Sequence, residues 1–236
     1  MTTPILLLNC GSSSIKYQVI DADSEEVVAS GLIQRIGDGE SLISHTYGGQ
    51  TLQDEHGFAD HAQALSYLVK LFDRVGPKLS DIIAVGHRTV HGGEAFRSTT
   101  LIDDSVIQKL RDLSPLAPLH NPPGIAGILA AQQALPQVPH VAIFDTAFFS
   151  SLPAEAYTYA IPREVAREHG IRKYGFHGTS HSYVSHKVAD LLGRDYNEMN
   201  QIVCHLGNGA SVSGIKAGVA VEASMGLTPL AGLVMG

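Results

Sequence analysis

The sequence predicts an α/β protein whose mixed sheet begins with an antiparallel hairpin. Four strand-like runs follow one another in the first third of the chain, and helical and strand-like segments alternate after them. A similar order of strand, polar turn and strand returns near residue 205, which indicates a second domain built like the first. At 236 residues, of which 44% are hydrophobic, the chain is long enough for one large domain or two small ones.

The first two strands enclose a polar turn, N-C-G-S-S-S-I-K, at residues 9–16. A phosphate-binding P-loop would place four residues between two glycines and continue as a helix. Here a largely β-branched and aromatic run follows Lys16, so we expect a hairpin. Gly11 permits a tight turn, and the serines from Ser12 to Ser14 offer hydroxyl and N–H donors to anionic oxygens. Lys16 adds a positive charge, although an ordinary polar turn is the alternative interpretation.

The other elements follow from the spacing of apolar residues. The opening strands are expected at residues 5–8, 15–20, 27–33 and 42–47, and further strands at 82–87 and 141–145. Helices are expected at residues 59–75, 105–113, 122–135, 163–169 and 179–192. We expect Asn121 to cap the helix at 122–135, with Pro122 in its first turn.

The segment Q-I-V-C-H-L-G-N-G-A-S-V-S-G-I-K at residues 201–216 repeats the layout of the opening hairpin. Two similar domains, each beginning with a hairpin that can hold phosphate, would face each other across a cleft. The sequence is therefore divided into a first domain at residues 1–150 and the first part of a second at 151–236. Two unrelated glycine-rich hairpins are the alternative.

Composition and charge exclude several classes of partner. The 16 Lys and Arg residues against 23 Asp and Glu give a formal charge of −7 without a basic stripe, so no nucleic-acid partner is expected. Cys10 and Cys204 lie in apolar strand contexts and are expected to be reduced, buried thiols. The N-terminus lacks the features of a secretory signal and no apolar run reaches membrane-spanning length, which predicts a cytoplasmic protein with no membrane partner.

Six short motifs are spread in order over the whole chain. The first is L-L-N-C-G-S-S-S-I-K at residues 7–16. The others are G-H-R-T-V-H-G-G at 86–93, H-N-P-P at 120–123, F-D-T-A-F at 144–148, Y-G-F-H-G-T-S-H at 174–181 and H-L-G-N-G-A-S at 205–211. With these motifs the chain resembles the acetate kinase family. The resemblance implies an actin-like ATPase fold, of the ribonuclease H-like type, with a duplicated domain whose second copy is incomplete here.

The resemblance also implies a reaction. An acetate kinase reversibly transfers a phosphoryl group from ATP to acetate in one direct in-line step, giving ADP and acetyl phosphate. Propionate kinase is the close alternative. Mg²⁺, with Mn²⁺ as a substitute, is the implied metal, ATP and acetate are the small-molecule partners, and a homodimer is implied for the full-length parent protein.

Individual residues match the family's functional positions. Asn9 resembles the metal-associated position, and a divalent ion with mostly water ligands and one protein oxygen suits Mg²⁺. Further positions resemble contacts to ATP phosphates: Ser12, Ser14, Lys16, His205, Leu206, Gly207, Asn208 and Gly209.

Three residues resemble the catalytic positions. Arg88 matches the substrate-binding arginine, whose forked guanidinium can engage both oxygens of a carboxylate; a surface ion pair is the structural alternative. Asp145 matches the acidic position. We expect it to organise Mg²⁺, its waters or Arg88, because a small carboxylic acid with a pKa of roughly 4 to 5 needs no base at neutral pH. His177 matches the residue that stabilises the transition state.

Val90, Leu119, Phe176 and Pro229 match positions around the substrate methyl group, although each is individually typical of a core residue.

Other functions are weaker interpretations. The pairs His177 and His181, and His87 and His91, have the spacing of zinc ligands, but Gly178 stands where a zinc protease carries Glu. No G-x-S-x-G motif surrounds Ser12 or Ser14, which argues against a serine hydrolase.

The chain departs from the family pattern at its end. Family members continue beyond Gly236 into a segment that supplies a catalytic arginine and the adenosine pocket. A fragment or a shortened form, able only to bind phosphate or a partner, is therefore the second functional hypothesis. We expect such a chain to expose apolar surface and unpaired strand edges and to be unstable or to aggregate.

Overall fold

The computed structural model describes residues 3–236 and contains two compact units. The first runs to Thr89 and also includes residues 100–114 and 118–142. The second comprises residues 90–99, 115–117 and 143–236. The division into domains at 1–150 and 151–236 stays a prediction.

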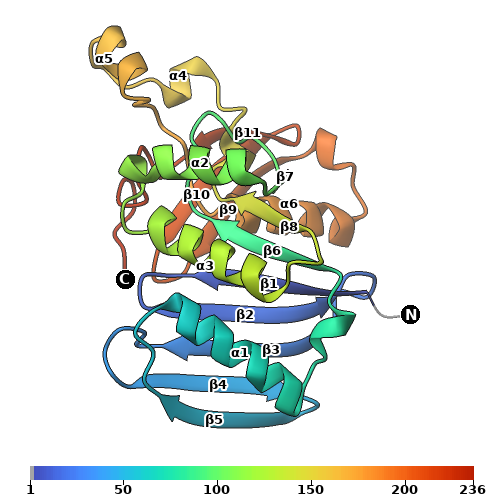
Figure 1. Cartoon of the computed structure of the whole chain (residues 1–236). Helices are drawn as coiled ribbons and strands as arrows, with labels where there is room; N and C mark the ends of the chain where they lie inside the picture. The colour runs from blue at the N-terminus through green and yellow to red at the C-terminus, as the bar shows by residue number, and fades with distance from the viewer. Residues whose placement is uncertain (1–2) are drawn as a thin grey trace. The chain divides into compact units, whose positions relative to one another are not determined.

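An eight-stranded mixed sheet forms the centre of the first unit (Figure 1). β1 (Pro4–Cys10) pairs antiparallel with β2 (Ser14–Asp21) and parallel with β6 (Ala84–Thr89), which confirms the predicted hairpin and the mixed sheet. The strand order is β5-β4-β3-β2-β1-β6-β8-β7. The remaining strands are β3 (Val27–Gln34), β4 (Ser41–Tyr47), β5 (Gln50–His56), β7 (Thr100–Leu101) and β8 (His140–Phe144).

Two of these strands are absent from the sequence-based expectation. β5 has the sequence Q-T-L-Q-D-E-H, which is too polar to predict a strand, and it lies at an edge of the sheet. β7 has two residues and lies at the other edge. Both owe their conformation to pairing with a neighbour, β4 for the first and β8 for the second, and such pairing leaves no local pattern.

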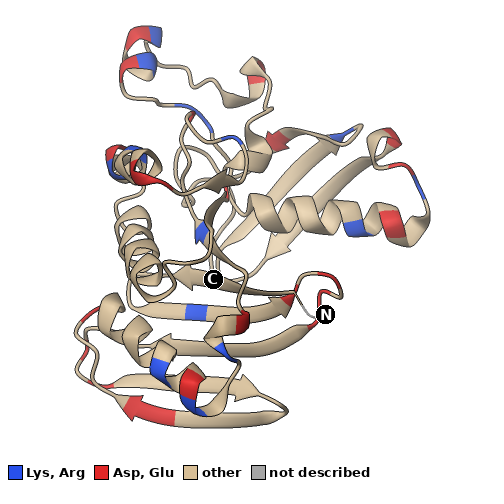
Figure 2. Cartoon of the chain, turned by 45° about the vertical axis from the view of Figure 1, so that its right-hand side comes forward, with Lys and Arg blue, Asp and Glu red and all other residues tan. Residues whose placement is uncertain are grey.

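Helices α1 (His61–Val75) and α3 (Asn121–Ala134) lie side by side over one face of this sheet (Figure 1). The sheet residues on that face are apolar and buried, among them Leu8, Tyr17 and Ile33. α3 has no charged residue (Figure 2), and it contacts α1, α2 (Asp104–Asp112), β1 and β6. A helix that is apolar on all sides is typical of a buried position.

The start of α3 corrects one expectation. Asn121 is the first residue of the helix and is 1% exposed, and His120 takes the capping position, so the prediction that Asn121 caps the helix was wrong. A capping side chain accepts from the N–H groups of the second and third helical residues. Counted from His120 these are Pro122 and Pro123, and proline has no N–H, which agrees with the absence of a capping hydrogen bond from the His120 side chain.

A buried polar chain links β2, β4 and the end of α1. The His45 Nε2–H donates to the Gly76 carbonyl over 3.0 Å, so the neutral ring accepts at Nδ1 from the Tyr17 hydroxyl over 2.8 Å. Burial lowers the pKa of His45, which agrees with a neutral ring. Gly31 lies directly opposite Tyr17 across β2 and β3, and a Cβ there would collide with the Tyr17 ring.

The second unit contains a three-stranded antiparallel sheet of order β11-β10-β9 and a helix, α6 (Gly178–Leu192), that contacts β9. β9 (Asn200–Leu206) and β10 (Ala210–Lys216) form the predicted second hairpin, and β11 (Val219–Ala223) was not predicted. Two short helices, α4 (Ala154–Tyr157) and α5 (Arg163–Glu168), precede α6.

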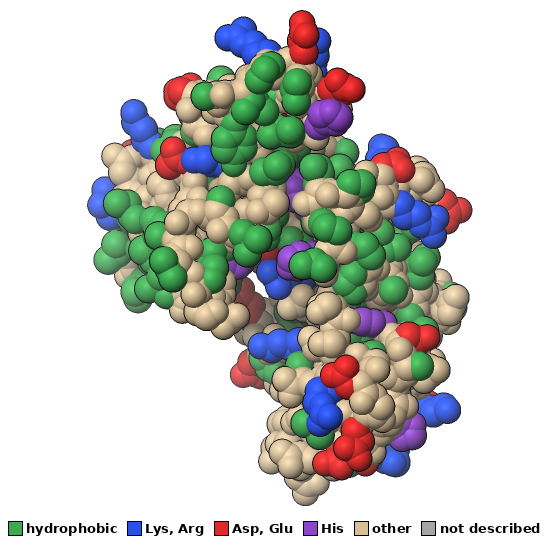
Figure 3. Space-filling model, turned by 90° about the vertical axis from the view of Figure 1, so that its left-hand side faces the viewer, with side chains coloured by type: hydrophobic (Ala, Val, Ile, Leu, Met, Phe, Trp, Pro, Cys, Tyr) green, Lys and Arg blue, Asp and Glu red, His purple; other side chains and the backbone are tan. Residues whose placement is uncertain are grey.

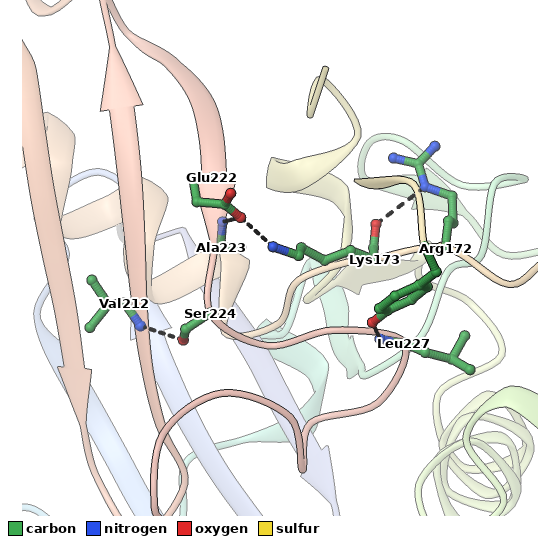
Figure 4. Close-up of polar contacts among 8 residues, drawn as sticks. Arg172, Lys173, Val212, Glu222, Ala223, Ser224 and Leu227 are labelled. Carbon is green, nitrogen blue, oxygen red and sulfur yellow. Dashed lines mark hydrogen bonds and ion pairs between the residues drawn. The ribbon is translucent and has the colours of Figure 1, made fainter. Parts of the chain in front are cut away.

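Polar contacts tie the loops of this unit to its sheet (Figure 4). Lys173 forms an ion pair with Glu222 on β11. The Ser224 hydroxyl accepts from the Val212 N–H over 2.9 Å, and the Tyr159 hydroxyl accepts from the Leu227 N–H over the same distance. Arg172 lies over the Tyr157 ring, 3.9 Å from its centroid. Together with the Tyr174 N–H, which donates to the Gly226 carbonyl over 3.0 Å, these contacts connect the segment around Tyr174 to β11 and the loop that follows it.

The cysteines and the surface agree only in part with expectation. Both thiols are free, but Cys10 is half-buried and Cys204 is exposed, because its side of β9 faces away from α6, so the prediction of two buried cysteines was wrong. Charged side chains of both signs are interspersed on the face shown in Figure 3. Within residues 3–236, no helix is long and apolar enough to cross a membrane.

Two glycine substitutions should have opposite effects on stability. Gly31→Ala inserts a Cβ into the space of the buried Tyr17 ring, and we expect it to lower the free energy of unfolding by about 1 to 3 kcal/mol. Gly124→Ala, inside α3 where no atom lies within 4 Å of the new Cβ, should raise it by about 0.5 to 1 kcal/mol. Urea denaturation of both variants measures these changes. Equal effects of the two substitutions would contradict this account of Gly31.

Candidate active site

The turn between β1 and β2 is held by one backbone hydrogen bond and one hydrogen bond from a histidine side chain. The Gly11 N–H donates to the Ser14 carbonyl over 2.8 Å, and the His61 Nε2–H donates to the Gly11 carbonyl over 2.7 Å. Ser12 is exposed and Ser14 is half-buried. The turn therefore has a defined shape while at least one hydroxyl stays accessible to a ligand.

Three of the predicted site residues of the first unit share one face of its sheet. Asn9 lies opposite Lys16 in the β1–β2 register, and residues paired in this way project to the same face. Arg88 is exposed on β6, next to β1, and its Nη1–H group contacts Asn9 Oδ1 at 3.4 Å. This face is the one opposite α1 and α3, so two positive charges and a neutral oxygen gather where the sheet carries no helix of this unit.

The residue before Arg88 shows how the strand is anchored. The His140 Nε2–H donates to the Leu135 carbonyl over 3.0 Å, so His140 Nδ1 accepts from the His87 Nε2–H, also over 3.0 Å. The two rings stack with centroids 5.3 Å apart. Burial, with a smaller contribution from the nearby His140, lowers the pKa of His87 to about 3. Because neighbouring residues of a strand alternate, burial of His87 directs Arg88 to the open face.

In the second unit, a backbone contact places Asp145 beside His177. Asp145 follows β8 and is 1% exposed, and its carbonyl accepts from the Gly178 N–H over 2.9 Å. A Cβ at position 178 would collide with that carbonyl, so only glycine permits the contact. His177, immediately before α6, has the left-handed φ of 58°. The prediction of these two residues as neighbours in one site is compatible with this geometry.

His177 also lies against the second hairpin. Its ring stacks on His205 with centroids 4.0 Å apart, and His205 forms a hydrogen bond to the Ser180 hydroxyl. A Cβ at Gly209 would lie 3.4 Å from His177 Nε2, so the turn at residues 207–209 approaches the ring closely. The five predicted phosphate contacts at 205–209 and His177 are therefore brought together, with Leu206 76% exposed at the strand end.

A buried chain of serines and histidines continues from His177. Ser211 Oγ lies 2.9 Å from His177 Nδ1 and 2.8 Å from His181 Nε2, and Ser213 Oγ lies 2.8 Å from His181 Nδ1. Burial, followed by the nearby His177 and His205, lowers the pKa of His181 to about 4. Ser211 and Ser213 were not predicted as site residues, and His181 was considered only as half of a histidine pair with zinc-ligand spacing. Two patterns in the sequence could have indicated them. Ser211 and Ser213 are alternate residues of one predicted strand, and His181 follows His177 by four residues.

These contacts bear on the zinc alternative. Both ring nitrogens of His181 are engaged by serine hydroxyls, and the His87 Nε2–H donates to His140. Within the described residues 3–236, no group of three His, Cys, Asp or Glu side chains is arranged to hold a metal. The histidine pairs with zinc-ligand spacing are explained by hydrogen bonding in this structure.

The four predicted methyl-pocket residues fall into different surroundings. Val90 and Phe176 belong to one apolar cluster, with Tyr174, Met225 and Leu227. Phe176 is 1% exposed, whereas Leu119 in the first unit is 73% exposed. Pro229 is half-buried. Only two of the four are therefore brought together within a unit.

The fold and these two hairpins define an α/β protein with a mixed sheet opened by a polar hairpin and a second hairpin against a histidine cluster. The family model described as the acetokinase family matches residues 4–236, and the chain belongs to that family.

Known proteins support this assignment over part of their length. An acetate kinase of Clavibacter michiganensis is 53% identical over 234 residues, which are 98% of this chain and 59% of that protein. The Porphyromonas gingivalis acetate kinase structure matches with a TM-score of 0.93 and 41% identity, over 99% of this chain and 60% of that one. A Francisella tularensis propionate kinase matches with a TM-score of 0.94 and 40% identity, again over 99% and 60%. The chain thus spans about three fifths of these relatives.

Buried neutral histidines should make the fold sensitive to mild acid. The pKa values of His87, His91 and His181 fall from an ordinary 6.5 to about 3, 4 and 4, chiefly through burial. Above pH 6.5 the folded and unfolded chains bind the same protons at these sites. Below it only the unfolded chain gains them, so the free energy of unfolding should fall by about 1.4 kcal/mol per pH unit for each histidine until pH 4.

Urea denaturation between pH 7.5 and pH 5 tests this expectation. A stability that stays constant over this range would show that the three rings are not held neutral.

Proposed function

We propose that this chain carries the acceptor-binding and phosphate-binding parts of a short-chain carboxylate kinase that phosphorylates acetate with ATP. The observation that carries the proposal is the shared sheet face of Asn9, Lys16 and Arg88, in a chain of the acetokinase family. ATP and acetate are both anions, and their oxygens need the guanidinium and ammonium groups that gather there. The similarity to acetate kinases of Clavibacter michiganensis and Porphyromonas gingivalis supports the same substrate.

Each residue has a proposed role. Arg88 binds the acetate carboxylate, and Lys16 with the turn at Ser12 and Ser14 binds phosphate oxygens. The segment from His205 to Gly209 binds ATP phosphates through its backbone, and His177 donates a hydrogen bond to the transferring phosphoryl group. Val90, Leu119, Phe176 and Pro229 enclose the methyl group. Direct in-line transfer needs no covalent intermediate on the protein, which agrees with a site made of donors and cations.

These residues suit a divalent metal that keeps most of its water ligands. Without a cluster of three ligands among residues 3–236, the chain has no dedicated metal cage, but Mg²⁺ keeps most of its waters and binds phosphates. Asn9 Oδ1 is the oxygen proposed to contact Mg²⁺, or Mn²⁺, directly or through water, and Asp145 is proposed to organise the metal, its waters or Arg88. When bound, the metal neutralises phosphate charge; Asp145 needs no role as a base, because acetate is already ionised.

The wider setting is also proposed from the family. We propose a cytoplasmic location and a homodimer for the complete protein, with no nucleic-acid or membrane partner. Propionate is the alternative acceptor, favoured by the match to a propionate kinase structure. One methylene in an apolar pocket changes binding by only about 1 to 3 kcal/mol, so the acceptor is decided by the detailed fit around the methyl group.

Hydroxylamine trapping of acyl phosphate tests the reaction. Purified chain, Mg²⁺ and ATP are combined with acetate, propionate or butyrate, and we expect product with acetate foremost. Arg88→Ala should raise the acetate KM by roughly 10- to 100-fold through loss of a charged hydrogen bond, whereas Arg111→Ala on α2 should not. A folded chain that binds ATP and forms no acyl phosphate would instead support a non-catalytic binding module.

The role of Asp145 predicts a metal-dependent defect. Asp145→Asn keeps the shape of the side chain but removes its charge, so we expect a higher Mg²⁺ requirement and recovery of most activity at excess Mg²⁺. Asp73→Asn on α1 is the matched control and should behave like the unaltered protein. A defect that is indifferent to the Mg²⁺ concentration would contradict this role. The measurement is the initial rate as a function of Mg²⁺ in the trapping assay.

A further inference from the structure

Four side chains of the second unit form one continuous hydrogen-bonded chain, Ser213–His181–Ser211–His177. Ser211 and Ser213 are alternate residues of β10 and therefore project to the same face of the sheet. His181 comes from the first turn of α6, and His177 directly precedes that helix. The distances are 2.9 Å from His177 Nδ1 to Ser211 Oγ, 2.8 Å from Ser211 Oγ to His181 Nε2, and 2.8 Å from His181 Nδ1 to Ser213 Oγ. Ser213, His181 and Ser211 are 1%, 0% and 2% exposed, so water does not complete these bonds.

The direction of the chain follows from its buried end. Among the described residues, the Ser213 hydroxyl contacts one hydrogen-bond partner, His181 Nδ1. A buried hydroxyl proton without an acceptor is unfavourable, so Ser213 donates to this nitrogen and Nδ1 carries no proton. The reverse direction, in which His181 Nδ1–H donates to Ser213, would leave the Ser213 proton without any acceptor.

Each following bond is then determined. A neutral His181 with an unprotonated Nδ1 carries its proton on Nε2 and donates it to Ser211 Oγ. The burial that lowers the pKa of His181 agrees with the neutral ring. Ser211 has a single hydroxyl proton, and its oxygen already accepts from His181, so the proton is donated to His177 Nδ1. A neutral His177 must carry its own proton on the other nitrogen, Nε2.

We propose that Ser213, His181 and Ser211 are positioning residues that hold the neutral His177 ring in the tautomer with its proton on Nε2. This nitrogen faces the turn of the second hairpin, because a Cβ at Gly209 would lie 3.4 Å from it. The chain thus directs an N–H donor toward the segment at 205–209. That this donor serves a phosphoryl group rests on the proposed function, whereas the tautomer itself does not.

Several other groups lie close to the His177 ring. His205 of β9 stacks on His177 and lies 6.4 Å from His181 between ring centroids, and its own Nδ1 is engaged with Ser180. Asp145 approaches this region through its backbone carbonyl, which accepts from Gly178. Ser211 Oγ is the hydrogen-bond partner of His177 Nδ1, so whether Nδ1 carries a proton depends on whether the Ser211 hydroxyl donates or accepts.

Nitrogen-15 NMR of histidine side chains measures the tautomer directly. Long-range correlations from the ring carbon protons distinguish protonated from unprotonated Nδ1 and Nε2. At pH 8, where an ordinary histidine with a pKa near 6.5 is neutral, we expect His177 to carry its proton on Nε2 in at least about tenfold excess. A His177 signal with the proton mainly on Nδ1 would overturn the proposal, and this measurement needs no variant.

Variants test whether the chain is the cause. Ser213→Ala removes the donor that determines the direction, so His177 should show a substantial Nδ1–H population. Ser185→Ala is the matched control, since Ser185 is a buried serine of α6 whose hydroxyl donates to the Ser182 carbonyl, outside the chain. The backbone amide spectrum verifies folding, and Ser213→Thr, which keeps a hydroxyl, should restore the Nε2–H form. An unchanged tautomer in folded Ser213→Ala would overturn the proposal, and Ser211→Ala replaces this variant if it misfolds.

Activity separates this inference from the proposed function. In an active protein, Ser213→Ala should lower kcat with little change in KM, and Ser185→Ala should change neither. A chain with the expected tautomer and no kinase activity would contradict the proposed function alone. Kinase activity with the proton of His177 on Nδ1 would contradict this inference alone.

Discussion

The alternation of side chains along a β-strand is the constraint on which both the core and the candidate site depend. On β1, β2 and β6 the residues Leu8, Tyr17 and His87 are buried, while their neighbours Asn9, Lys16 and Arg88 project to the opposite face. Packing of the helices on one face thus decides where the charged groups of the other face lie. A shift of one residue in the register would exchange the two sets, so the hydrophobic core itself specifies the arrangement of the site.

The second unit uses the same constraint with a different chemistry. Ser211 and Ser213 project from β10 toward α6, and the contact of Gly178 with the Asp145 carbonyl brings the start of that helix to the end of β8. Because glycine alone permits this approach, the position of His177 is set by backbone packing and not by its own side chain. The ring then needs only one hydrogen bond, at Nδ1, to define its orientation and tautomer.

Several buried histidines in this chain have a structural role, because their ring nitrogens connect separate elements by hydrogen bonds. His45 joins two strands and a helix end, His87 and His140 form a stacked pair, and His181 links two serines. In His45, His140 and His181 both ring nitrogens form hydrogen bonds, one as donor and the other as acceptor, which is possible only for a neutral imidazole. Burial favours this neutral state, since charging the ring in an apolar interior is costly. The same side chain therefore supplies directional bonds without a buried charge.

The sequence by itself determined the strands of both hairpins, the long helices and the family of the protein, because periodicity and short motifs are local properties of the chain. The edge strand β5, the absence of a cap at Asn121 and the exposure of Cys204 depended on neighbours that local pattern does not show. Tertiary structure alone decided that Ser211 lies between His177 and His181, residues about 30 positions away on another element. A tautomer depends on which donors and acceptors are buried together, and that becomes known only when the chain is folded.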